Sequence, residues 1–266
     1  MIKFYFIVIK NNMNIKKIIK KIIYSSNITL FIFVKIKRLL INPVSQSNEG
    51  RIIDELVKKY KINKNYLEIG FSPWEYNCST ISDKNEGIII DANKENIKIG
   101  GWIIKKAKLI CEFIDLDNIE KILKKINLNI NILSLDIDGN DFYIMEKLIK
   151  LNPSLIICEY NPAYALRPIT SIYKKNFDRT KEDKDWLYYG CSIKGWEILM
   201  KKNEYSMIAI SDSRVNVFFI KNNLIIDKSE IITPEDDFVD YDWPEEMGNG
   251  VDMWNKIKHK QYKLIN

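Results

Sequence analysis

The sequence contains a single histidine, His259, which lies in a lysine-rich stretch near the end of the 266-residue chain. A mechanism that uses a histidine base or histidine metal ligands in the core is therefore disfavoured. The four cysteines are far apart and form no CxxC pair, which is typical of reduced thiols and not of zinc sites or disulfides. Any chemistry must fall to carboxylates, tyrosine, lysine or asparagine, and a cytoplasmic location is predicted.

Two further absences exclude classes of ligand. The chain has no GxGxxG segment, so a dehydrogenase that binds a nicotinamide or flavin dinucleotide, including an NAD-linked sugar-modifying enzyme, is disfavoured. Arginine is scarce, at 5 residues against 36 lysines, whereas phosphate recognition favours arginine. Nucleic acid is therefore not a predicted partner.

Acidic residues are missing from the first 48 positions, which carry nine lysines and arginines. The apolar stretches at 4–9 and 22–41 are too short or too interrupted to span a bilayer, which needs ~20 largely apolar residues. Two interpretations of residues 1–49 remain open. The favoured one is a helical extension packed on the domain; the other is a basic amphipathic segment in peripheral contact with an anionic inner membrane face.

Short apolar runs alternate with helix-like segments from residue 50 onward. Continuous apolar runs such as 86–91, 131–136 and 153–159 predict buried parallel strands, and the helical spacing between them predicts βαβ units. The runs at 205–211 and 215–221 are too close for a crossover, so they predict an antiparallel hairpin. We expect an α/β methyltransferase-like domain over 50–225, with a mostly parallel seven-stranded sheet and an acidic extension at 226–266 packed on it.

Two residues in the first half of this domain point to an adenosine-containing ligand. Gly70 follows the first predicted strand in YLEIGFSPWEY, and Asp91 ends the second, about 20 residues later. Ligands of open α/β sheets bind at the carboxyl ends of the strands, where such an acid can accept both hydroxyls of a ribose. The alternative is a turn glycine and an aspartate that caps the next helix.

Carboxylates crowd the end of another apolar strand, in LSLDIDGNDFY at 133–143. A turn and a helix cap account for Gly139 and Asp141, but they leave Asp136 unexplained. The following strand ends in CEYNP, so Glu159 and Asn161 are expected beside Asp136. The three side chains could hold Mg²⁺ or Ca²⁺, or could form a polar floor that binds a substrate hydroxyl.

Six segments in this order resemble the FkbM-like branch of class I S-adenosylmethionine-dependent methyltransferases: YLEIGFSPWEYNCST, GIIIDAN, LSLDIDGNDFYIMEKL, PSLIICEYNP, WLYYGCSIKGWEIL and RVNVFFIKNNL. The resemblance covers about residues 50–225 and implies a Rossmann-like fold and methyl transfer to sugars or other small oxygen nucleophiles. It also implies that Glu68 and Gly70 lie against the methionine part of the cofactor. Asp91 would then hold the ribose, with Asp115 near the adenine.

The expected activity is O-methylation of a glycan, nucleotide sugar or other small hydroxyl acceptor. Its candidate base is Asp136 or Asp138, with Asp136 also expected at the cofactor, unless a Mg²⁺ ion bound by Asp136, Glu159 and Asn161 lowers the pKa of the hydroxyl. The candidate acceptor-binding residues are Glu159, Asn161, Tyr164, Arg167 and Tyr188. The competing hypothesis is a non-catalytic methyltransferase-like domain that binds a nucleoside or a partner, for which Asp136 and Asp138 have no use.

Overall fold

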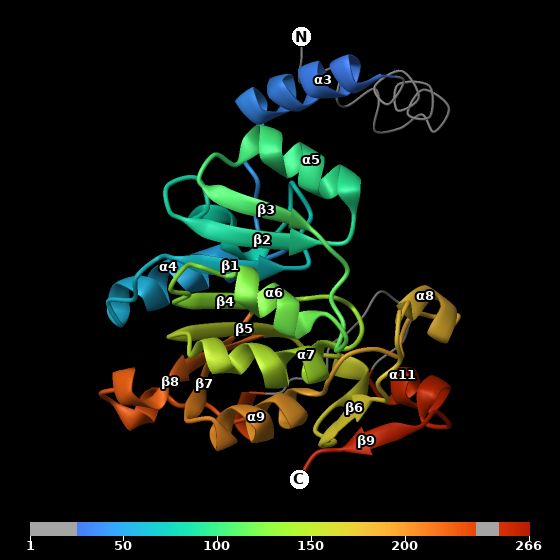
Figure 1. Cartoon of the computed structure of the whole chain (residues 1–266). Helices are drawn as coiled ribbons and strands as arrows, with labels where there is room; N and C mark the ends of the chain where they lie inside the picture. The colour runs from blue at the N-terminus through green and yellow to red at the C-terminus, as the bar shows by residue number, and fades with distance from the viewer. Residues whose placement is uncertain (1–25, 238–249) are drawn as a thin grey trace.

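A seven-stranded sheet in the order β3-β2-β1-β4-β5-β8-β7 forms the centre of the computed structural model, which describes residues 26–237 and 250–266 (Figure 1). All strand pairs from β3 to β5 are parallel, whereas β8 is antiparallel to both of its neighbours. This order confirms the predicted Rossmann-like fold of class I methyltransferases. The strands are β1 Tyr66–Ile69, β2 Gly87–Asp91, β3 Ala107–Cys111, β4 Ile132–Leu135, β5 Leu155–Glu159, β7 Tyr205–Ile210 and β8 Asn216–Lys221.

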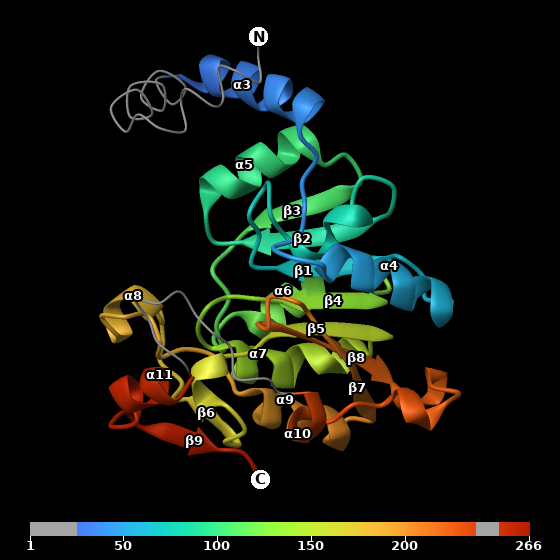
Figure 2. The same ribbon diagram turned by 180° about the vertical axis from the view of Figure 1, so that it is seen from behind.

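Helices cover both faces of the sheet, which explains why the central strands are apolar without alternation. Helices α6 (Ile119–Lys125), α7 (Asp141–Leu148) and α9 (Ile193–Lys202) lie in front of the sheet in Figure 1. Helices α4 (Glu49–Lys59) and α5 (Lys94–Ile103) pack against the other face, and the reverse view of Figure 2 brings α4 to the front. Two separate hydrophobic clusters, one on each face, form the core.

The antiparallel end of the sheet is the predicted hairpin. Strands β7 and β8 pair from Tyr205 with Lys221 to Ile210 with Val217, and a bulge lies between Met207 and Ala209. The second strand of the hairpin returns between β5 and β7, so Asn216 is placed opposite Glu159 at the end of β5. The hairpin therefore brings a polar side chain to the edge where the parallel strands end.

Helix α3 (Asn27–Leu40) precedes this domain and lies on α5 at one extreme of the molecule (Figure 1). Ser26 begins it with a capping box, in which its hydroxyl accepts a hydrogen bond from the backbone N–H of Thr29 at 3.1 Å. Leu30 and Val34 are buried against the domain. The predicted helical extension is thus found at 27–40, while residues 1–25 lie outside the described part.

No transmembrane helix is found among the described residues. Helix α3 is apolar but has only 14 residues, against the ~20 that a spanning helix needs.

An insertion between β5 and α9 and the C-terminal residues form a small second layer. The insertion holds β6 (Ile169–Ser171) and α8 (Arg179–Glu182), and β6 pairs antiparallel with β9 (Tyr262–Leu264). Helix α11 (Gly250–Ile257) packs on the start of the insertion, and α10 (Pro234–Asp237) packs on α9. Both described parts of 226–266 therefore contact the rest of the structure, and residues 238–249 lie outside the description.

Candidate active site

A cleft of about 470 Å³ opens at the carboxyl ends of the parallel strands. Strand β1 lies between β2 and β4, so the chain leaves it in opposite directions, which is the place where ligands bind in open α/β sheets. The loops after β1 to β5 line the cleft, together with part of the insertion and the start of β8. Its polar lining comprises Gln46, Glu68, Ser72, Glu75, Tyr76, Asn77, Asp91, Glu112, Asp136, Asp138, Asn140, Glu159, Arg179 and Asn216.

Gly70 lets the chain turn sharply at the bottom of the cleft. Its φ of 84° lies in the left-handed region, and a Cβ atom here would stand 1.4 Å from the backbone oxygen of Asp136. The backbone N–H of Gly70 donates to the carbonyl of Ile90, and that of Asp136 donates to the carbonyl of Ile69. Glycine is therefore required for the loops after β1 and β4 to touch.

The carboxylate of Glu68 anchors the loop after β1. It is 1% exposed and accepts hydrogen bonds from the backbone N–H groups of Asn77 and Cys78, at 3.2 and 3.0 Å, and from the hydroxyl of Ser134. Burial raises the pKa of Glu68 to about 7, although these hydrogen bonds oppose the rise. Glu68 lines the cleft, as the resemblance implied, but much of its hydrogen-bonding capacity holds the short 3₁₀ turn at Asn77–Thr80.

Asp91 joins the loops after β1 and β2. Its Oδ2 accepts from the backbone N–H of Phe71 at 2.9 Å, and its Oδ1 accepts from that of Asn93 at 2.7 Å. The side-chain amide of Asn96 reaches the same Oδ1 and the carbonyl of Phe71. Oδ1 accepts two of these bonds and Oδ2 only one, so Oδ2 can accept a further bond, and Asp91 is held in place while it still lines the cleft. Asn93, not Asp91, caps the next helix, so the capping alternative fails at this position.

Asp136 and Glu159 form an acidic pair at the ends of the adjacent strands β4 and β5. One oxygen of each, together with one of Asp138, lie within 4.8 Å of one another. Burial, followed by the charge of Asp138, raises the pKa of Asp136 well above its ordinary value. Burial and the charge of Asp136 do the same to the pKa of Glu159. Like charges at this separation cannot both ionise easily, so the pair retains a proton at pH values where isolated carboxyls have lost theirs.

Arg179 completes this group from helix α8 of the insertion. Its guanidinium pairs with Asp138, donates to the carbonyl of Trp186 at 3.0 Å and lies 3.8 Å from the ring centre of Tyr189. The hydroxyl of Tyr189 donates to Glu159 at 3.4 Å. A cation and a phenol therefore surround the acidic pair on the side of the insertion.

Asp141 shapes the loop that carries Asp138. Its two oxygens accept from the backbone N–H groups of Ile137 and Gly139, both at 2.8 Å. This arrangement holds Asp138 at a left-handed φ of 54° and directs the loop toward the insertion. Burial raises the pKa of Asp141 to about 6. Asp141 is thus a structural carboxylate, as the turn interpretation predicts.

Five sequence-predicted residues lie outside the cleft lining. Asp115 is buried and accepts from the backbone N–H of Asp117, while its neighbours Phe113 and Ile114 line the cleft instead. Asn161 is also buried, because its amide donates to the carbonyls of Leu187 and Tyr189 and its oxygen caps the turn at Ala163. The expected metal set of Asp136, Glu159 and Asn161 is therefore not assembled; Asp138 takes the third place.

The predicted acceptor residues Tyr164, Arg167 and Tyr188 also differ from expectation. The hydroxyl of Tyr164 accepts from the backbone N–H of Tyr189 at 3.1 Å, in an aromatic cluster with Trp254. Arg167 stacks on Trp254 at 4.2 Å. The hydroxyl of Tyr188 donates to the carbonyl of Gln261 at 2.6 Å. The polar groups of these three side chains are thus used in contacts within the insertion and with the C-terminal residues. Of the predicted acceptor residues, only Glu159 lines the cleft.

Two residues at the cleft escaped the sequence interpretation. Arg179 lies in a stretch with no motif, and its only signal is the scarcity of arginine. Asn216 is the first residue of β8; it is 2% exposed, and its Oδ1 has no hydrogen-bond partner among the described residues. A polar residue at the start of an otherwise apolar strand was the signal that could have identified it. A buried acceptor without a partner at a cleft wall indicates a ligand or water that donates to it.

Acidic side chains dominate the lining of the cleft. Seven acidic side chains line it (Glu68, Glu75, Asp91, Glu112, Asp136, Asp138 and Glu159), whereas Arg179 is the one basic side chain among the described lining residues. Such a cleft attracts cations and repels polyanions.

Comparisons with known proteins give similarity at the level of structure. No protein-family model matches, and no curated protein matches. A Staphylococcus aureus protein assigned as a caffeoyl-CoA O-methyltransferase is 16% identical, with a TM-score of 0.45 over 79% of this chain and 100% of its own. An O-methyltransferase from Bacillus cereus, in complex with S-adenosylhomocysteine, is 14% identical, with a TM-score of 0.44 over 80% and 100% of the two chains. A methyltransferase from Geobacter sulfurreducens is 13% identical, with a TM-score of 0.42 over 79% and 96%.

Identities of this size say nothing about substrate or reaction. The assignment that follows therefore depends on the geometry and charge of the cleft.

Proposed function

We propose that the chain is an S-adenosylmethionine-dependent methyltransferase that methylates a hydroxyl oxygen of a small uncharged acceptor. The observation that carries the proposal is the acidic cleft at the switch point of the sheet, with the Asp136–Glu159 pair at its base. The FkbM-like sequence resemblance agrees with this proposal and adds a sugar as the expected acceptor class.

The cofactor fits the cleft by charge and by size. S-adenosylmethionine carries a sulfonium cation and an ammonium group, which suit a lining with seven carboxylates. A volume of about 470 Å³ lies within the range of ~300–1,000 Å³ that is usual for small-molecule sites. The unpartnered Oδ1 of Asn216 offers a fixed acceptor at the wall. The phosphates of a dinucleotide or a nucleic acid would be repelled by the same acidic side chains.

Three groups would hold the cofactor. Asp91, fixed by two backbone N–H groups, would accept the ribose hydroxyls. The Gly70–Phe71 turn would lie against the methionine part, and Gly70 keeps this turn in contact with the loop after β4. Phe113 and Ile114, and not Asp115, would supply the apolar contact to the adenine.

The Asp136–Glu159 pair would act as the general base. When bound, the cofactor supplies a methyl group on a positively charged sulfur, and the acceptor oxygen must lose its proton as the methyl group arrives. A carboxylate whose pKa is raised is a stronger base than an ordinary one, and burial raises the pKa of both members of the pair. Tyr189 orients Glu159 through its hydroxyl. Arg179 pairs with Asp138 and so offsets the negative charge beside the pair.

The remaining specificity follows from charge and from the side chains of the insertion. A neutral sugar hydroxyl or a comparable alcohol is favoured over a nucleotide sugar, because a diphosphate would face the acidic lining. We also propose that Arg179, and not Mg²⁺, supplies positive charge at this position. A divalent cation at Asp136, Asp138 and Glu159 would have to displace the guanidinium from Asp138.

Calorimetric titration with S-adenosylhomocysteine tests the cofactor assignment. We expect Asp91→Ala to weaken binding by roughly 10- to 100-fold, which corresponds to ~1.5–3 kcal/mol for hydrogen bonds to a charged group. The matched control is Asp117→Ala, an exposed aspartate outside the cleft, which should bind as the wild type does. Absence of wild-type binding would contradict the cofactor, and unchanged affinity of Asp91→Ala would contradict the ribose contact.

A screen with a methyl-labelled cofactor tests the acceptor and the metal. Label should pass to neutral sugars or alcohols in preference to nucleotide sugars. Full activity after treatment with EDTA is expected; activity that disappears and returns with Mg²⁺ would show that the acidic group holds a metal ion.

A further inference from the structure

The outward face of helix α3 is an apolar stripe that nothing in the described structure covers. Ile28, Ile32, Ile36 and Leu39 form it, at spacings of four, four and three residues that place them on one side of a helix. They are 72%, 50%, 53% and 86% exposed. We call these four residues the α3 stripe.

The opposite side of the same helix is also apolar. Leu30 and Val34 are buried on the domain, and Phe31 meets Trp102 of α5 edge to face, with ring centres 5.2 Å apart. An ordinary surface helix has one apolar face, which it buries, and one polar face. One apolar face of α3 packs on the domain, and a second apolar face points away from it. An exposed apolar face of this kind indicates a surface that contacts another molecule.

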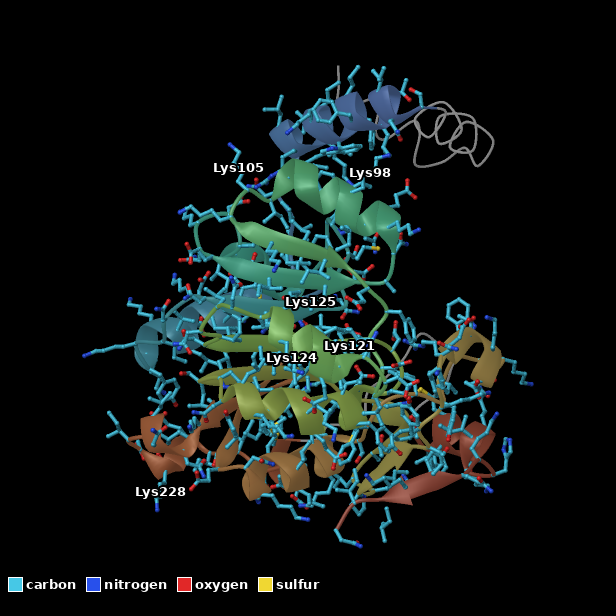
Figure 3. All side chains as sticks on the ribbon, in the orientation of Figure 1. Lys98, Lys105, Lys121, Lys124, Lys125 and Lys228 are labelled. Carbon is cyan, nitrogen blue, oxygen red and sulfur yellow. The ribbon has the colours of Figure 1, made fainter. Side chains whose placement is uncertain are left out.

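Basic groups border the stripe. Lys35 is exposed on α3 and is held by a hydrogen bond to the carbonyl of Trp102. Lys98 lies in the middle of α5 and donates a hydrogen bond to Asn27 of α3, and Lys105 lies just beyond the end of α5 (Figure 3). Helix α3 offers no acidic residue of its own, because positions 1–48 contain none. Arg38 of α3 does have an acidic partner, because it forms an ion pair with Asp83.

We propose that helix α3 binds to the surface of an anionic lipid bilayer, with the α3 stripe inserted at the level of the headgroups. The combination of an apolar face, a basic border and no acidic residue is that of helices that lie in the membrane interface. The helix is at the edge of the domain beyond β3, so the domain does not shield it (Figure 1, Figure 2).

Charge favours an anionic bilayer over a second copy of the chain as the partner of the α3 stripe. A symmetric dimer through the stripe would bring the basic residues of two copies of α3 close together, with no acidic residue in either helix to offset them. An anionic bilayer offers both apolar chains and negative charge to the same surface. The proposal does not depend on the methyltransferase reaction.

Vesicle co-sedimentation of the full chain tests the proposal. The wild-type protein should sediment with vesicles of 70% phosphatidylcholine and 30% phosphatidylglycerol, should not sediment with pure phosphatidylcholine, and should dissociate as salt is raised. The double variant Ile32→Glu and Leu39→Glu should bind at least roughly tenfold more weakly, since it removes two apolar anchors and adds negative charge. Both side chains are exposed, so its melting temperature should stay that of the wild type.

The matched control is Ile226→Glu with Val251→Glu, which adds the same charge at two exposed apolar positions away from α3. It should sediment like the wild type. A wild-type protein that ignores anionic vesicles overturns the proposal. So does a stripe variant that binds as well as the control, because the membrane contact would then lie elsewhere. A dimer seen by light scattering that dissociates in the stripe variant, without vesicle binding, would assign the surface to a second copy.

Discussion

The two halves of the cleft use carboxylates in opposite ways. At the end of β1 and β2, Glu68 and Asp91 each accept two backbone N–H groups, and their positions are fixed by the loops that they join. At the end of β4 and β5, no backbone N–H among the described residues donates to the side chain of Asp136 or Glu159. These two carboxyls face each other and carry strongly raised pKa values.

On the proposed function, this difference separates a binding half of the site, at β1 and β2, from a reacting half, at β4 and β5. Backbone donors hold the carboxylates of Glu68 and Asp91 in fixed positions, which makes each a precise acceptor for a further donor. A carboxylate that is buried beside another one has a raised pKa, so it is a better base. Its ionised form also costs free energy, because burial and the like charge both disfavour it. The experiments below alter one half at a time.

The largest effect is expected from Asp136→Asn in the reacting half. The change keeps size and removes the charge, so methyl transfer to an acceptor found in the screen should fall by ~10²–10⁴-fold, while the affinity for S-adenosylhomocysteine is retained. Asp54→Asn, an exposed change on α4, is the control. Full activity in Asp136→Asn would remove Asp136 from the mechanism. A parallel loss of binding, activity and melting temperature would support the non-catalytic alternative with a structural Asp136.

The second largest effect is expected at Gly70, where the loops of the two halves touch, and it concerns the free energy of unfolding. Gly70→Ala forces a Cβ atom onto the backbone oxygen of Asp136 at a left-handed φ, so we expect a loss of ~3 kcal/mol or more in the free energy of unfolding. Gly101→Ala has open space around its Cβ atom within α5 and should instead stabilise by up to ~1 kcal/mol. Urea denaturation of both variants measures the contrast. Equal stabilities would mean that the loops can separate.

The smallest effect concerns Glu68 in the binding half and depends on pH. Burial raises its pKa to about 7 in the folded state, so the folded protein binds this proton more tightly than the unfolded chain does. Its contribution to stability is therefore greatest below about pH 4.5 and is lost as pH rises to about 7, by up to ~3 kcal/mol. Glu68→Gln resembles the protonated form and should flatten this dependence.

Calorimetric melting at pH 5 and pH 8 measures the dependence on Glu68. The control Glu120→Gln, at an exposed position of α6, should keep the wild-type slope. An unchanged slope in Glu68→Gln would mean that the carboxyl of Glu68 titrates normally.

The sequence predicts the sheet well because buried parallel strands are nearly continuous apolar runs, and runs such as 153–159 have few other interpretations. The residues that directly follow these strands, such as Asp91, Asp136 and Glu159, are placed correctly for the same reason, since strand ends share one edge. Asn161 shows where this reasoning stops. It lies only two residues beyond Glu159, yet the chain has already turned there, and its amide binds the insertion instead.

Arg179 illustrates the other limit. It is 43 residues from Asp136 in the sequence, and only the fold of the insertion brings its guanidinium to Asp138. A contact between segments so far apart leaves no periodicity or spacing in the sequence. The membrane-binding alternative for residues 1–49 was open for a related reason, because sequence alone does not tell which apolar side chains of 27–40 the domain covers.

The hydrogen bonds between the Asp138 loop and the insertion have a consequence for redesign of the cleft. The amide of Asn140 donates to the carbonyl of Lys174, and the backbone N–H of Gly190 donates to the carbonyl of Gly139, where a side chain would collide with Phe177. On the proposed function, the side chains of the insertion that line the cleft and the loop beside the acidic pair would thus form one structural unit. A graft that aims at a new acceptor has to transplant 137–141 together with 162–190, because a foreign insertion on the native loop would lose the contacts that fix both.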